Sequence, residues 1–107
     1  MGIARLSLAI IGMAIAVTQV HGQQLSDRQK GRVLARQVCA ECHAVGRRIS
    51  RSPNSEAPSF AAVASTPGMT AMALNVFFQT SHRTMPNLIL TADQTREIIA
   101  YITSLKR

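Results

Sequence analysis

Hydrophobic residues recur with helical spacing most regularly near the C-terminal end of the chain. Apolar side chains stand there at i, i+3, i+4 and i+7, namely at Ile98, Tyr101, Ile102 and Leu105. Thr91 precedes this stretch, with Gln94 three residues later, and this pattern is typical of a capping box at a helix N-terminus. The spacing therefore predicts an amphipathic helix that begins after Thr91 and buries one apolar face.

A second helix is predicted to begin at Ser26, because Gln29 completes another capping-box pattern there. Leu34 and Val38 stand four residues apart and should share its buried face, with Val33 beside them.

Gly31 interrupts this predicted helix. A glycine inside a helix costs about 1 kcal/mol relative to alanine. Either another backbone or a ring packs closely against Gly31, or the glycine is tolerated at the surface. The periodicity of the sequence leaves both explanations open.

A third, shorter helix is predicted over residues 70–80, capped by Thr70, with Leu74, Phe77 and Phe78 facing inward. The linking regions are interrupted by prolines, and no segment alternates between apolar and polar residues for long enough to form a strand. The fold class is therefore predicted to be all-α, with three or more short helices joined by ordered loops.

The first 22 residues have a different character. Met1–Arg5 is short and basic, Leu6–Val17 has no charged residue, and small or aliphatic residues in Val20–Gly22 end the segment. This pattern predicts a secretory signal peptide over 1–22 and a mature domain over 23–107. An uncleaved membrane anchor is the alternative, but Leu6–Val20 has 15 residues, fewer than the roughly 17–25 of a spanning helix. The expected location is the periplasm.

The mature domain would be small and basic. Its 85 residues are marginal for folding without a disulfide, metal or cofactor. After residue 22, eleven Lys and Arg stand against five Asp and Glu. Export argues against nucleic acid as the partner, as do the few aromatic residues, three Phe and one Tyr. The positive charge instead favours protein partners with acidic patches.

The two cysteines of the chain lie in the pentapeptide Cys39-Ala40-Glu41-Cys42-His43. A zinc site would need a second pair of ligands, and downstream of the motif the chain offers only His82. A redox-active dithiol would need a strand before the motif and a helix after it, in a chain predicted to lack strands. Neither interpretation accounts for the whole motif.

Attachment of a haem uses every residue of this C-x-x-C-H motif. Cys39 and Cys42 lie on one side of a helical turn and can form thioethers with the two vinyl groups of a porphyrin. His43 follows directly and can offer an imidazole nitrogen to the iron. The motif and the export signal agree, and they predict one covalently bound haem c per chain.

The sixth iron position decides between electron transfer and ligand binding. Met85 is the first candidate, because it lies between two predicted helices and Pro86 stiffens the backbone after it. His82 is the alternative and would give a bis-histidine haem. Met72 is expected to be core filler, and Met69 could be either.

The residues from about Ser26 to Arg107 resemble a small bacterial class I cytochrome c with a single haem. Gly31 stands where this family has the glycine of its N-terminal helix, and Tyr101 where it has the aromatic packed against that glycine. The resemblance implies a fold wrapped around the haem, and it implies that the Pro58 carbonyl accepts a hydrogen bond from His43. Ala35 departs from the family, which often has an aromatic there. The roles of three loop arginines stay open, including pairing with a haem propionate: Arg47, Arg48 and Arg51.

A His/Met-ligated haem has no open iron position, so the predicted function is transfer of one electron between redox partners rather than catalysis. Such a carrier is expected to be a monomer without stable membrane insertion. Two alternatives remain: a haem subunit held permanently in a larger oxidoreductase or respiratory complex, and a ligand-binding sensor with an open sixth position.

Overall fold

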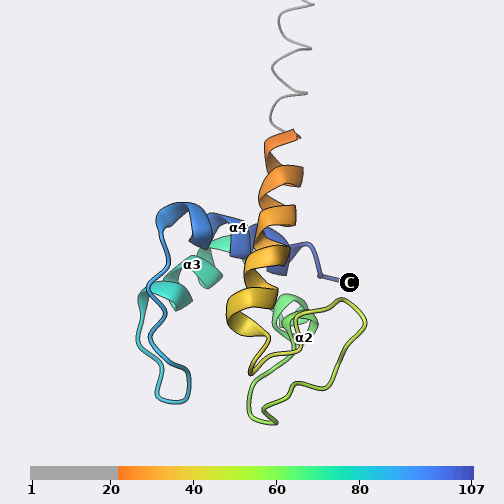
Figure 1. Cartoon of the computed structure of the whole chain (residues 1–107), viewed down its shortest axis with the longest axis vertical. Helices are drawn as coiled ribbons and strands as arrows, with labels where there is room; N and C mark the ends of the chain where they lie inside the picture. Colours follow the sequence, from red (N-terminus) through yellow and green to blue (C-terminus); the bar gives the residue numbers. More distant parts are fainter. Residues whose placement is uncertain (1–21) are drawn as a thin grey trace, which may run out of the picture.

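The computed structural model describes residues 22–107, which form helices and connecting loops without a strand in that range (Figure 1). Residues 22–34 are α-helical and continue into a π-helical turn, η1 (Ala35–Cys39). The later helices are α2 (Phe60–Ser65), α3 (Ala71–Gln79) and α4 (Ala92–Thr103). The all-α prediction is therefore confirmed. The predicted signal peptide lies outside the described residues except for Gly22, and no helix within residues 22–107 has the length and apolar character needed to cross a membrane.

Side-chain caps fix the N-termini of the three later helices. Thr70 Oγ1 accepts a hydrogen bond of 3.1 Å from the Ala73 amide at the start of α3. Thr91 and Gln94 form the reciprocal capping box of α4, with bonds of 3.1 and 3.0 Å. Both predicted caps are confirmed. Helix α2 was not predicted, and Ser59 caps it in the same way.

The first helix crosses α4 at Gly31 (Figure 1). A Cβ atom at this position would lie 1.9 Å from the Glu97 carbonyl oxygen and 2.9 Å from Tyr101 Cβ. The backbones of the two helices therefore approach so closely that no side chain fits between them. Of the two explanations for this glycine, close packing is confirmed.

The start and the buried face of the first helix differ from the prediction. Helical structure is already present at residue 22, so Ser26 lies inside the helix instead of capping it. Val33 is 54 % exposed and Val38 40 % exposed, whereas Ala35 is fully buried. The reason is the crossing: the face that carries Gly31 must meet α4, and the valines point elsewhere.

A buried carboxylate ties the first helix to α4 beside this crossing. Asp27 is 4 % exposed, and it accepts hydrogen bonds of 3.0 Å from Arg96 Nε and from Gln23 Nε2. Arg96 also donates to Asp93, at 2.7 Å. The hydrogen bond from Arg96 holds the pKa of Asp27 below its ordinary value, so the carboxylate stays charged at neutral pH.

Helix α4 supplies the centre of the core. All four predicted apolar positions are buried: Ile98, Tyr101 and Ile102 in α4, and Leu105 two residues after its end. The Tyr101 hydroxyl donates to the Val45 carbonyl, so this phenol satisfies its polar end inside the core. Phe60 packs against the Tyr101 ring with centroids 6.4 Å apart. The core thus reaches from the helix crossing to the segment that follows the cysteine motif.

Candidate functional site

All six residues predicted as haem tethers, iron ligands or hydrogen-bond partner line one cavity of about 460 Å³. They come from three separate parts of the chain: Cys39, Cys42 and His43, then Pro58, then His82 and Met85. Much of the remaining wall is apolar, including Val63, Leu74 and Ile102. This volume and lining lie in the range of cofactor sites, which are mostly apolar pockets of roughly 300–1,000 Å³.

A π-helical turn, η1, positions the cysteines at the cavity wall. The Ala40 amide donates to the Ala35 carbonyl at 3.0 Å, five residues back instead of four. The His43 amide then returns to the Cys39 carbonyl at 2.9 Å. Such π turns are rare and often occur at functional sites. Here the wide turn includes Cys39, the first residue of the motif, and both cysteines line the cavity wall.

The Cys39 thiol is in an apolar setting. Burial raises its pKa to about 11, so at neutral pH it is protonated. Redox-active dithiols instead have a cysteine whose pKa is lowered, because the thiolate is the nucleophile. The surroundings of Cys39 therefore argue against a dithiol-disulfide catalyst.

The imidazole of His43 is oriented by the backbone across the cavity. Its Nδ1 lies 2.7 Å from the Pro58 carbonyl oxygen. A carbonyl oxygen can only accept, so Nδ1 carries a proton, and in the neutral tautomer of this ring the lone pair is on Nε2. The Phe60 ring packs against the imidazole at a centroid distance of 5.4 Å. His43 thus presents one ring nitrogen that is able to bind a metal, in a ring that lines the cavity.

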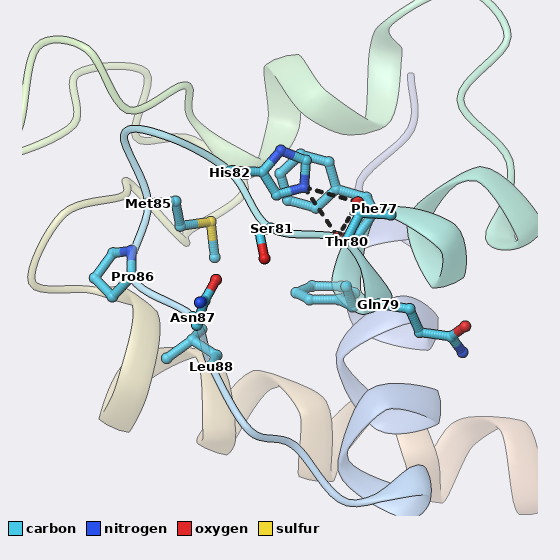
Figure 2. A pocket seen from close by; sticks show the side chains of 10 residues that line it. Phe77, Gln79, Thr80, Ser81, His82, Met85, Pro86, Asn87 and Leu88 are labelled. Carbon is cyan, nitrogen blue, oxygen red and sulfur yellow. Dashed lines mark hydrogen bonds between the residues drawn. The ribbon is translucent and has the colours of Figure 1, made fainter.

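Met85 and His82 lie in the loop between α3 and α4. Figure 2 shows the Met85 thioether pointing from this loop into a smaller pocket of about 170 Å³. His82 is engaged differently: its ring stacks on Phe77 with centroids 3.6 Å apart, and its Nε2 lies 3.0 Å from the Phe77 carbonyl oxygen. Both side chains line the large cavity.

The other two methionines within residues 22–107 lie in different surroundings. Met69 lines the cavity and packs against the core. Met72, expected as core filler, is 76 % exposed, so that expectation is wrong. It lies in the first turn of α3, on the face turned away from Leu74.

The loop arginines do not line the cavity. Arg47 Nη2 donates to the Ser104 carbonyl at 2.8 Å, just past the end of α4, and Arg107 donates to the Arg47 carbonyl at 3.2 Å. A cation at this position satisfies a carbonyl at the helix end and complements the helix dipole. For Arg47 the structure therefore gives a role in holding the C-terminus.

Sequence reasoning missed the aromatic residues that shape the site. Phe60 packs against both His43 and Tyr101, and Phe77 supports His82. Phe77 was expected to face inward with the core but is 39 % exposed and lines the cavity. The spacing of apolar residues along the chain cannot distinguish the core from the cavity wall, since both surroundings are apolar.

No protein-family model matches the chain, and no solved structure is significantly similar to it. The protein named cytochrome c-552 from Bradyrhizobium diazoefficiens is 34 % identical over 104 residues. The alignment covers 94 % of this chain and 97 % of that relative. Similarity at this level over nearly the full length of both proteins, together with the C-x-x-C-H motif on the wall of an apolar cavity, identifies the chain as a member of the cytochrome c family.

Proposed function

We propose that this protein is a periplasmic one-electron carrier with a single class I c-type haem. Cys39 and Cys42 would hold the haem as thioethers, and His43 and Met85 would be the axial ligands. The observation that carries the proposal is the single cavity onto which the two thiols, an oriented imidazole and a thioether converge. When bound there, the haem would supply a one-electron iron couple.

The residues present fit that group. The Pro58 carbonyl fixes the His43 tautomer that leaves Nε2 able to bind iron, and such a hydrogen bond raises the basicity of a ligand histidine. The apolar walls would shield a bound haem from water. The thioether of Met85 is a soft ligand that raises the reduction potential. Each of these contributions favours electron transfer at a preorganised iron.

Met85 is a better candidate than His82 for the sixth ligand. Within residues 22–107 the Met85 side chain makes no hydrogen bond that ligation would have to break, whereas His82 would lose its stacking on Phe77 and its bonded carbonyl. Losing a hydrogen bond and an aromatic contact costs about 1 kcal/mol each.

Replacement of Met85 by alanine tests this assignment. We expect the oxidised wild-type protein to show the far-red absorption band of a methionine bound to Fe(III). The band should disappear in Met85→Ala, and the reduced variant should bind carbon monoxide readily. Met72→Ala is the matched control, because Met72 is exposed and lies outside the cavity lining. An unchanged spectrum in Met85→Ala would contradict the assignment and favour His82.

The exposed face of the first helix offers a docking surface for acidic partners. Arg28, Arg32 and Arg36 follow one another at intervals of four residues, and all three are exposed. No carboxylate in residues 22–107 forms an ion pair with them: three of the five acids pair with Arg96 or Lys30, and the other two form no ion pair within these residues. We name these three residues the arginine stripe. It ends at Arg36, three residues before Cys39, which lies on the wall of the proposed haem cavity.

The arginine stripe predicts salt-sensitive reactions with anions. Oxidation of the reduced protein by ferricyanide should slow with increasing ionic strength. Changing the three stripe arginines to glutamine should reduce the rate about tenfold at low salt, because local charge steers the encounter. A control triple variant, Arg48→Gln, Arg51→Gln and Lys106→Gln, removes the same net charge elsewhere. Equal slowing in both triple variants would show that net charge alone acts, and would contradict the localised docking surface.

A further inference from the structure

The loop that carries Met85 has little support from its own backbone. Residues 81–90 form no helix or strand, and Figure 1 shows them as a long excursion between α3 and α4. None of these ten residues takes part in a backbone–backbone hydrogen bond within the described part of the chain. Yet a methionine ligand must be held in place, since a thioether is a weak ligand that other ligands can displace. Something else must therefore fix this loop.

His82 makes the side-chain hydrogen bonds that tie residues 81–90 to the rest of the described chain. Its Nε2 lies 3.0 Å from the Phe77 carbonyl oxygen and 3.2 Å from Thr80 Oγ1 (Figure 2). Phe77 is in the last turn of α3, where helix carbonyls lack partners within the helix. The histidine thus extends the capping of α3 into the loop.

Stacking adds a second constraint on the same ring. The imidazole lies nearly parallel to the Phe77 ring, at 16° and a centroid distance of 3.6 Å. Phe77 packs edge-on against Phe78 at 6.0 Å, and Phe78 is packed against the core. Aromatic side chains therefore connect the loop to the core, whereas the backbone of residues 81–90 makes no backbone–backbone hydrogen bond within the described residues.

Met85 follows His82 by three residues, and Pro86 follows Met85. Three residues span at most about 11 Å, so a fixed His82 confines the region that the thioether can reach. The restricted backbone of Pro86 limits the loop on the other side. His82, Met85 and Phe77 line the same two cavities, so the anchor and the ligand candidate border the same space.

From this arrangement we propose that His82 is a positioning residue, which holds the loop so that the Met85 thioether keeps its place at the iron against competing ligands. The inference rests on the proposed function, and it gives His82 a role that is separate from ligation. It acts through hydrogen bonding and stacking on α3, not by binding the iron.

Displacement of Met85 by added imidazole measures this role. The far-red band of the oxidised protein is titrated with imidazole in the wild type and in His82→Ala. We expect His82→Ala to keep the band without imidazole, and to bind imidazole about tenfold more tightly, because loss of the hydrogen bond and the stack frees the loop. His82→Phe should retain the stack alone and His82→Gln a hydrogen bond alone, so both should show intermediate affinities.

Ser81→Ala is the matched control, since Ser81 lies next to His82 in the loop and makes no side-chain hydrogen bond within residues 22–107. It should bind imidazole like the wild type. Wild-type affinity in His82→Ala would overturn the positioning role while leaving Met85 as ligand. Failure of the proposed ligation has another signature: the wild type itself would lack the far-red band, and Met85→Ala would match it.

Discussion

Changing Cys39 and Cys42 together to alanine is expected to abolish covalent haem attachment. Both thiols lie on the wall of the cavity that would hold the ring. Each can form one thioether, so the double variant has no means of covalent attachment, whereas each single variant keeps one. The measurement is a haem stain after denaturing electrophoresis, combined with the mass of the intact protein. The wild type should carry the mass of one haem.

The same double variant should also be less stable. A small domain with an apolar cavity of about 460 Å³ loses packing when nothing fills it. Wild-type apoprotein, prepared without haem, is the matched control for this loss and should unfold like the double variant. A haem stain that survives denaturation in Cys39→Ala/Cys42→Ala would contradict attachment through these cysteines.

Gly31→Ala should destabilise the protein by about 3 kcal/mol, near the upper end for overpacking. The added methyl group would lie 1.9 Å from the Glu97 carbonyl oxygen, and this atom belongs to the backbone of α4 and cannot rotate away. The helices would have to separate, which would disturb the contact between the first helix and Tyr101. In an open helix the same change would instead stabilise, by about 1 kcal/mol. Chemical denaturation of the haem-loaded protein measures the free energy of unfolding.

Gly46→Ala is the matched control for that prediction. Its new methyl group would lie 3.1 Å from Ile49 Cδ1, the end of a side chain that is 59 % exposed and able to move. We expect a change within about 0.5 kcal/mol, as for other surface substitutions. If Gly31→Ala were as stable as Gly46→Ala, the close crossing of the two helices would be wrong.

The sequence predicted those parts of the fold that local interactions decide. The caps at Thr70 and Thr91 depend on neighbouring amides, and the apolar face of α4 repeats regularly. Ser26 failed as a cap because the same Ser-x-x-Gln pattern is compatible with the interior of a longer helix. Val33 and Val38 failed as core residues because Gly31, which has no side chain, determines the buried face. Apolar periodicity cannot detect a face defined by a missing side chain.

The candidate site also has parts that the sequence predicts and parts that depend on the folded structure. The cysteine motif is contiguous, so its chemistry follows from sequence, and the Pro58 carbonyl came from a family resemblance. The stacking of His82 on Phe77 depends on how the chain turns after α3, and no spacing of residues encodes it. From the sequence, His82 is an alternative iron ligand; the structure adds that its ring stacks on Phe77 while lining the same cavity as Met85.

The number of residues between Gly31 and Cys39 is constrained, because each must face a different part of the molecule. The π-helical turn η1 forms part of the segment between them. Gly31 must face α4, and Cys39, eight residues later, must face the cavity. One residue more or less between them would rotate the cysteine by about 100° around the helix axis. The helix therefore tolerates substitution more readily than a change of length between these residues. Transfer of the C-x-x-C-H motif to an ideal α-helix would therefore require the π-helical turn η1 as well as the motif residues.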